Sequence, residues 1–324
     1  YNFCKRERGV VSLVAERLIK RRVALKKEGS EIAKEKAAYI KWLLVTMFGY
    51  QAFKNRKIGI IEAHESIQAY AREIIMKTVR VAESLGWEVV HGIVDSVYVK
   101  MKGHNKNQID HLKHEIIKQT GFEIAVEGSY KWIVFLPSIS NEAMPVSSHF
   151  YGVFENGEIK ARGIEIRRKD MPAIVIKMQT DMIKILANSK NQNEFISYFN
   201  EVFKILRKYI EGLDKSDVDE LSISRRISKT DYQNNIPQKI IIDELKEEGW
   251  EMHAGQTINY VIRDVDNVNP SRRYVNSNNF KGEFDKGKYI ELMVKATTNI
   301  LQPFGVNERM VWDKTKKTRQ MKLI

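Results

Sequence analysis

The hydrophobic period of the chain changes at Gly86, and this change constrains the fold more than any other feature. Before it, apolar residues recur at helical spacing over three segments, namely 11–27, about 31–48 and 62–85. Gly29 separates the first two segments, and Ser30 is a suitable N-cap for the second. With so short a connection, these two helices are expected to pack antiparallel as a hairpin.

Beyond Gly86 the pattern is that of short strands. β-Rich runs at 88–91 and 97–100 predict a hairpin whose turn lies within residues 92–96. A helix at 107–119 and strands at 122–126, 132–136, 151–154 and 158–164 should follow, with Asn156-Gly157 as a two-residue turn. Hairpins covered by helices indicate an antiparallel sheet in an α+β fold, and not a parallel βαβ series.

After residue 172 the helical period returns. It extends over 174–187, 192–209, about 237–249 and about 286–304. We therefore place a domain boundary near residue 172.

The charge of the chain indicates a polyanionic partner. Lys and Arg number 54 against 41 acidic residues, a formal net charge of +13, and the excess is concentrated over residues 1–57 and from Lys314 onward. Such a surface favours contacts to phosphates that depend strongly on salt. The alternative is a basic surface that serves only solubility.

Four segments, in order along the chain, match known sequence motifs. Residues 41–50, Lys-Trp-Leu-Leu-Val-Thr-Met-Phe-Gly-Tyr, are similar to a Lys on a helix followed by Asn-Ser-x-Tyr-Gly. Residues 91–96, His-Gly-Ile-Val-Asp-Ser, resemble Tyr-Gly-Asp-Thr-Asp-Ser on a β-hairpin. Residues 162–170, Arg-Gly-Ile-Glu-Ile-Arg-Arg-Lys-Asp, look like a Lys-Gly-x-Glu-x-x-Arg-Arg-Asp run. Residues 221–229, together with 235–237 and 255–262, form the fourth match.

Together the four segments resemble family B DNA polymerases of the archaeal type, in family order and over essentially the whole chain. The resemblance implies an α+β fold with a helical-hairpin fingers unit at 1–57. An antiparallel-sheet palm with covering helices is implied at 58–172, and a mostly helical thumb at 173–324. The implied activity is template-dependent nucleotidyl transfer from dNTP to primer–template DNA with two Mg²⁺ ions.

The resemblance assigns the catalytic metal site to Asp95. This residue matches the second Asp of the hairpin motif, which in the family bridges both metal ions, and Glu127 is a further candidate ligand. The alternative for Asp95 is an ordinary turn-capping residue, which is common in hairpins.

The nucleotide is expected to contact the fingers. Arg21 and Lys41 resemble the family's triphosphate-binding residues on the two facing helices, where their charges would neutralise phosphates. Phe48 and Gly49 match an aromatic ring and a small residue that support the nascent base pair. The alternatives are solvated helix charges for the first pair and a core position for Phe48.

The duplex is expected to contact basic residues in the third and fourth motifs. These candidates are Arg162, Arg167, Arg168, Arg225, Arg226 and Lys229. For the first three, a role at the seam between palm and thumb is equally open.

Several departures from the family pattern remove polar groups that handle substrate. Ile93 and Val94 replace the first Asp and the Thr of the hairpin motif, and Val45-Thr46 replaces Asn-Ser. Ser147 begins a segment that is Lys-rich in the family. Two functions therefore stay open: a polymerase part that needs a first catalytic Asp from elsewhere, or a degenerate module that binds DNA or a replication partner without catalysis.

The partner implied by the first function is an N-terminal polymerase polypeptide that carries the exonuclease region and the first motif. We expect the protein in the cytoplasm, at the nucleoid. The single cysteine, Cys4, which excludes an intramolecular disulfide, fits a reducing compartment. The sequence contains no run of eighteen or more uncharged apolar residues, so no membrane span is predicted.

Overall fold

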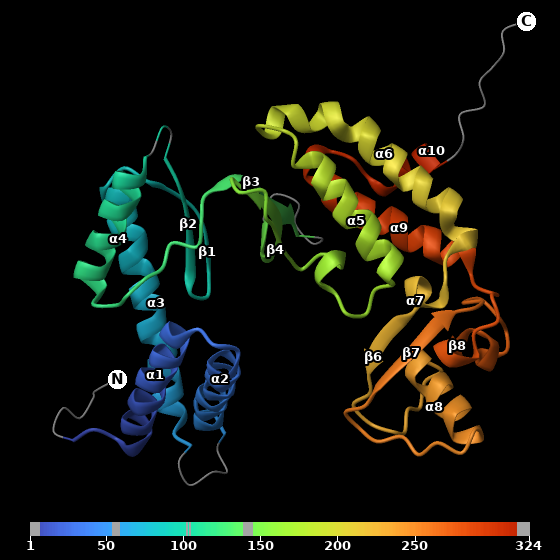
Figure 1. The fold of residues 1–324 in the computed structure, drawn as a ribbon, viewed down its shortest axis with the longest axis horizontal. Coiled ribbons are helices and arrows are strands. Elements are labelled where there is room, and N and C mark those ends of the chain that lie inside the picture. The colour runs from blue at the N-terminus through green and yellow to red at the C-terminus, as the bar shows by residue number, and fades with distance from the viewer. Residues whose placement is uncertain (1–6, 54–58, 102, 104, 139–144, 316–324) are drawn as a thin grey trace, which may run out of the picture. The chain divides into compact units, whose positions relative to one another are not determined.

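The computed structural model describes residues 7–53, 59–101, 103, 105–138 and 145–315. The chain forms two compact units, Tyr1–Val126 and Glu127–Ile324 (Figure 1). This division lies within the palm predicted for 58–172, and the three-part division into fingers, palm and thumb stays a prediction. Cys4 and the basic residues after Lys314 lie outside the described residues.

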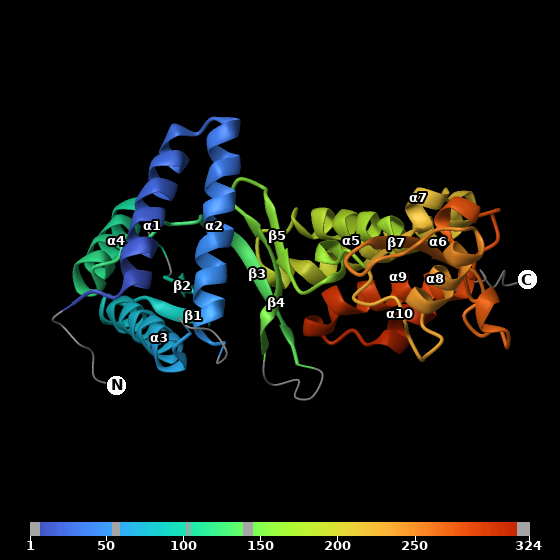
Figure 2. The same ribbon diagram turned by 90° about the horizontal axis from the view of Figure 1, so that it is seen from below.

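The first unit begins with the predicted helical hairpin. Helix α1 (Val10–Glu28) and helix α2 (Glu31–Gln51) lie side by side (Figure 2). Gly29 adopts a left-handed conformation that ends α1, and the Ser30 hydroxyl accepts a hydrogen bond from the backbone N–H of Ala33 at 3.2 Å. Leu25, Ala33 and Ala37 are buried together, so small side chains on α2 let the helices approach closely.

Helix α3 (Ile61–Ser84) leads into the predicted β-hairpin. Strand β1 (Glu88–Ile93) pairs antiparallel with β2 (Ser96–Lys100), and helix α4 (Lys106–Thr120) packs against α3. The core of this part is small. Its buried members are Ala82, Trp87, Leu112 and Ile116.

The predicted strand at 122–126 is wrong. Gly121 ends α4 in a left-handed conformation, and the following residues are extended but have no regular structure. Phe122 and Val126 are exposed. Their β propensity is not realised because no described strand pairs with this segment, and an isolated strand has no ladder to stabilise it.

The second unit opens with a three-stranded antiparallel sheet of order β3-β4-β5. Its strands are β3 (Tyr130–Pro137), β4 (Pro145–Phe154) and β5 (Ile159–Arg162). Gly157 has a φ of 86° in the predicted turn between β4 and β5. The α+β fold class is confirmed.

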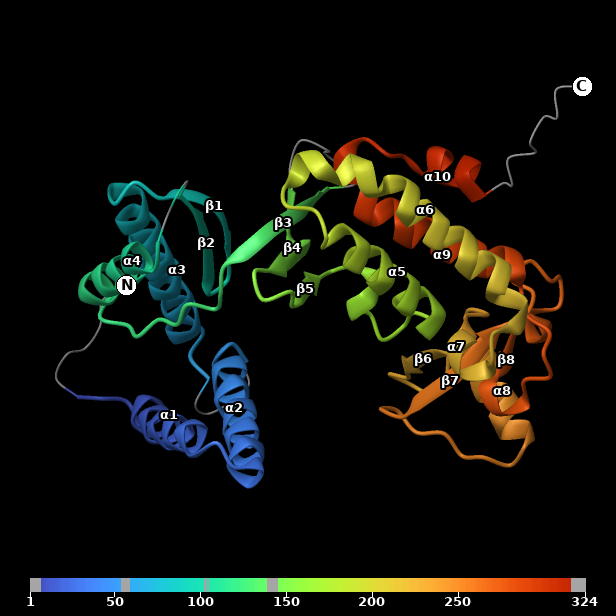
Figure 3. The ribbon, with the colours of Figure 1, turned by 45° about the horizontal axis from the view of Figure 1, so that its top comes forward.

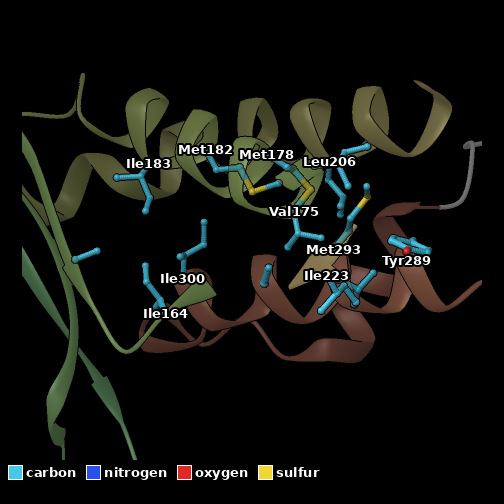
Figure 4. Close-up of a cluster of buried hydrophobic side chains, with 14 of the residues drawn as sticks. Ile164, Val175, Met178, Met182, Ile183, Leu206, Ile223, Tyr289, Met293 and Ile300 are labelled. Atoms are coloured by element: carbon cyan, nitrogen blue, oxygen red, sulfur yellow. The ribbon is translucent and has the colours of Figure 1, made fainter. Parts of the chain in front are cut away.

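Helices form the centre of the second unit. They are α5 (Ala173–Leu186), α6 (Phe195–Gly212), α9 (Lys286–Leu301) and α10 (Glu308–Thr315). Helices α5, α6 and α9 pack against one another (Figure 3). Figure 4 shows the core between them, where Met178, Leu206 and Met293 are fully buried. The buried Tyr151 hydroxyl donates to the carbonyl oxygen of Ile300 at 2.6 Å and so joins β4 to α9. Desolvation by burial raises the pKa of Tyr151.

A second sheet of order β6-β7-β8 was not predicted. Its strands are β6 (Ile223–Arg226), β7 (Thr257–Ile262) and β8 (Tyr274–Asn276). Helix α7 (Val218–Leu221) precedes β6 along the chain, and helix α8 (Pro237–Glu247) lies between β6 and β7. Short 3-10 helices occur at Glu165–Arg167, Gln192–Glu194, Leu213–Lys215, Pro270–Arg272, Ser277–Asn279 and Gln302–Phe304. None of the helices in the described ranges is long and apolar enough to span a membrane.

The run 162–170 joins the first sheet to the helices through a buried polar network. Glu165 is buried, and its carboxylate accepts hydrogen bonds from Gln179 on α5 and Asn299 on α9, both at 2.6 Å. Gln179 also donates to the carbonyl oxygen of Ala296 at 2.9 Å and accepts from the backbone N–H of Ile166 at 3.0 Å. These partners satisfy the buried groups, so the Glu of this motif has a structural role.

Gly163→Ala should destabilise the protein by about 2–5 kcal/mol. Gly163 has a φ of 70°, and a Cβ there would lie 2.7 Å from the carbonyl oxygen of Ser148 and closer still to the His149 ring. The left-handed conformation costs a side chain about 1–2 kcal/mol, and overpacking adds about 1–3 kcal/mol. Denaturant unfolding measures the change. Gly157→Ala is the control, because φ is also positive there but no atom lies within 4 Å. An equal loss in both variants would contradict the packing argument.

Candidate active site

The β1–β2 hairpin presents Asp95 at its tip. Ile93 pairs with Ser96, so Val94 and Asp95 are the two turn residues. The Asp95 carboxylate is exposed and accepts a hydrogen bond from the Ser96 hydroxyl at 3.4 Å, and no cation among the described residues forms an ion pair with it. Its remaining oxygen lone pairs are open to an external cation.

The two residues before Asp95 differ sharply in their surroundings. Val94 is 87% exposed with a φ of 48°, the one non-glycine residue with positive φ in the described part of the chain. A β-branched residue in this conformation is strained, but a tight hairpin turn requires positive φ at this position. Ile93 is 6% exposed, so the position matching the first Asp of the motif is a buried apolar one.

Glu127 belongs to the second unit and pairs with Lys160 there. Its charge is therefore already balanced. Within the described ranges no group of three or more His, Cys, Asp or Glu side chains could hold a metal ion. Asp95 is thus a single carboxylate and not part of a complete ligand set.

Arg21 and Lys41 both lie exposed on the helical hairpin. Neither forms an ion pair with another described residue, whereas nearby Lys20 pairs with Glu16 at 2.7 Å and Lys34 pairs with Glu31 at 2.6 Å. Two unpaired cations on facing helices can therefore accept an external anion without breaking an internal contact.

Arg22 is a residue that the sequence reasoning missed. Its Nε donates to the carbonyl oxygen of Ala37 on α2 at 3.3 Å, which leaves its terminal nitrogens available. Ala37 lies one turn before Lys41, so the Arg22 guanidinium is brought to the same stripe of α2 as Lys41. The helical period gives a signal for this contact, because Arg22 shares the packing face of α1 with Leu18 and Leu25.

Phe48 is held by His64, a second residue that the sequence reasoning missed. The two rings stack with centroids 4.2 Å apart, and His64 Nδ1 lies 3.1 Å from the carbonyl oxygen of Phe48. This carbonyl is in the last turn of α2, where no helical N–H is available to it. Since a carbonyl only accepts, Nδ1 carries the proton and Nε2 accepts from the Gln68 amide at 2.9 Å.

Gly49 follows Phe48 and faces open space. Apart from its two chain neighbours and the adjacent backbone of its own helix, no atom of the described chain lies within 4 Å of the position that a Cβ would occupy. Glycine within a helix costs about 1 kcal/mol relative to alanine. The packing of the chain does not require this glycine, whereas close approach of a ligand would.

Two of the expected DNA-binding arginines are engaged within the second unit. Arg168 binds the Asp170 carboxylate through two nitrogens, each at 3.0 Å, and Arg225 on β6 binds the same carboxylate at 3.2 Å. The hydrogen bond from Arg168 lowers the pKa of Asp170. These two residues tie the run 162–170 to the second sheet.

The other four expected DNA contacts lie exposed. Arg162 and Arg167 form no ion pair with a described residue. Arg226 donates through Nε to the carbonyl oxygen of Gly255 at 2.9 Å, and the Lys229 ammonium lies 5.2 Å from the centroid of the Tyr232 ring. Their charges remain available at the surface.

The order of these elements along the chain is that of a nucleic-acid polymerase domain: a helical hairpin, a β-hairpin with a carboxylate at its tip, and a second unit in which the run 162–170 joins an antiparallel sheet to helices. More narrowly, the chain belongs to DNA polymerase family B, whose family model matches residues 4–304.

Individual relatives agree with this family. The chain is 34% identical over 190 residues to DNA polymerase 2 of Saccharolobus solfataricus, a match that covers 59% of this chain and 28% of that protein. It is 26% identical over 339 residues to a DNA polymerase of Pyrococcus glycovorans, covering 98% of this chain and 42% of the relative. The chain thus spans less than half the length of these relatives.

A solved structure shows the same fold. The family B DNA polymerase of Pyrobaculum calidifontis superposes with a TM-score of 0.59 at 24% identity, over 94% of this chain and 39% of that one.

Proposed function

We propose that this chain is the fingers, palm and thumb portion of a DNA-directed DNA polymerase. The first catalytic carboxylate would come from polymerase sequence outside residues 1–324, in the same or in a partner polypeptide. The observation that carries the proposal is Asp95, an exposed carboxylate without a paired cation at the tip of a hairpin in a family B chain.

The residues fit part of a two-metal site. Two Mg²⁺ ions would activate the primer 3′-oxygen and neutralise charge that develops on the phosphate. Asp95 offers free oxygen atoms as one ligand, whereas Glu127 would first have to release Lys160. Two divalent ions repel each other, so the single carboxylate of the hairpin needs a second from elsewhere.

The other residues would position substrate. Arg21 and Lys41 would bind the triphosphate, and Gly49 would admit the base pair against the Phe48 ring held by His64. The exposed cations of the second unit would contact the duplex backbone. They are Arg162, Arg167, Arg226 and Lys229.

Binding of primer–template DNA should weaken steeply with salt and show little sequence preference. With several phosphates neutralised, the plot of log affinity against log salt should have a slope of magnitude about 3 or more. Fluorescence anisotropy of labelled DNA across a salt series measures it, and an acidic polypeptide of equal charge is the control ligand. An affinity that does not change with salt concentration, or that is no higher for DNA than for the acidic polypeptide, would reject DNA as the partner.

A second candidate function is a non-catalytic DNA-binding or structural subunit in replication or repair. Burial of Ile93 favours it, because the hairpin position that matches a catalytic Asp is occupied by a core residue. Intact DNA binding without activity in any complemented form would favour this candidate.

A further inference from the structure

Helix α2 carries two large aromatic side chains that nothing in the described chain covers. Tyr39 is 71% exposed and Trp42 is 67% exposed. Leaving rings of this size in water forgoes a large hydrophobic stabilisation. They lie three residues apart, so they are neighbours on the helix surface with a rise of about 5 Å between them.

The same face reaches the proposed nucleotide site. Gly49 follows Trp42 by seven residues, which is two turns and about 10 Å along the same side of the helix. The space over Gly49 is open. The aromatic pair is therefore continuous with the surface proposed to support the nascent base pair.

The helical hairpin that carries the pair has an excess of positive charge, which suits a polyanion. Residues 7–53 carry ten basic and five acidic side chains. Of the basic residues, Arg17, Lys26 and Lys27 on the neighbouring α1 are exposed and form no ion pair with a described residue. The acidic residues on this face are Glu35 and Glu31, one and two turns before Tyr39, and Glu31 is paired with Lys34.

We propose that Tyr39 and Trp42 form a stacking surface for unpaired bases of single-stranded nucleic acid, the template ahead of the primer end. Stacking tolerates any base, because each has a π face, and nearby cations bind the backbone. The proposal rests on the proposed polymerase function and adds a site for a second part of its substrate.

A covering protein is the competing occupant. Ile32, Leu43 and Tyr50 on α2 are also exposed, as is usual for a face that binds protein. The basic excess of residues 7–53 and the continuity with Gly49 favour nucleic acid.

The test compares the affinity of the full chain for two primer–templates, one blunt and one with an unpaired 5′ template extension. Wild type should bind the extended DNA more tightly. Trp42→Ala should reduce that gain by about 5- to 150-fold, the range for losing one base–aromatic stack, and leave blunt-duplex affinity unchanged. Trp42→Phe should retain most of it. Trp250→Ala is the matched control, because Trp250 is 64% exposed in the second unit.

The outcomes are distinguishable. If wild type binds neither DNA, the proposed function fails together with the stacking surface. If wild type binds both and Trp42→Ala leaves the gain from the extension intact, the stacking surface alone is overturned. The same holds if Trp42→Ala weakens only association with a complementing polymerase polypeptide, because the face would then be a protein contact.

Discussion

Asp95→Asn should abolish nucleotidyl transfer once the polymerase is complemented by a polypeptide that supplies the first motif. The substitution keeps the size of the side chain but removes its charge, so the exposed hairpin tip and its hydrogen bond from Ser96 are preserved. Removal of one group that stabilises transition-state charge costs about 10²- to 10³-fold, and loss of a carboxylate shared by two ions should cost at least as much.

The measurement is metal-dependent primer extension by the 324-residue chain alone, by the mixture with the complementing polypeptide, and by the mixture with Asp95→Asn. The chain alone should be inactive, the mixture active and the variant mixture inactive. Asp110→Asn is the matched control, because Asp110 is an exposed carboxylate on α4 of the same unit. Robust extension by the isolated chain would refute the proposal that a carboxylate is supplied from outside it.

Local sequence signals predicted most of the elements in the first unit. The helical hairpin follows from period, from Gly29 and from a Ser30 cap that forms as expected. The β-hairpin follows from two short β-rich runs and closes on a two-residue turn. Each of these signals lies within a few residues of the structure that it specifies, so it can be recognised from the sequence alone.

Pairing between distant segments was not predictable. The β6-β7-β8 sheet joins short strands on either side of α8, and no local period indicates which strand finds a partner. The strand expected at 122–126 failed for the same reason. The β propensity of a residue measures how well it fits a half-buried sheet, so it has an effect only where a partner strand forms that sheet.

The same limit applies to the candidate site: local motifs identified residues, but not the contacts between distant segments. The motifs identified Asp95, Lys41 and Gly49 as candidates, and the structure leaves all three exposed. The motifs did not predict that Arg225 and Arg168 would both bind the Asp170 carboxylate. The contact between Arg225 and Asp170 joins residues 55 positions apart, and it exists only once the sheets and helices are packed.

Sequence reasoning also missed the support for the proposed nucleotide surface. His64 looks like an ordinary helical residue in sequence, but it stacks on Phe48 and binds the carbonyl at the end of α2. Its role depends on how α2 and α3 pack together, which a single sequence does not state.

Lys41→Ala should lower the efficiency of dNTP use by the complemented polymerase by about 10- to 1000-fold, while affinity for primer–template DNA changes by less than about threefold. Lys41 is exposed and forms no ion pair with a described residue, so its ammonium is available to a triphosphate. A charged contact of this kind is worth roughly 1.5–4 kcal/mol.

Steady-state extension against dNTP concentration measures the efficiency of dNTP use, and anisotropy with labelled DNA measures the affinity for primer–template. Lys36→Ala is the control, because five residues place Lys36 about 140° around the same helix, away from the proposed nucleotide face. A loss of DNA affinity with unchanged dNTP affinity would assign Lys41 to the duplex. Equal effects of the two substitutions would show that only the net charge of α2 matters, since each removes one positive charge from the same helix and only Lys41 shares a stripe with Val45 and Phe48.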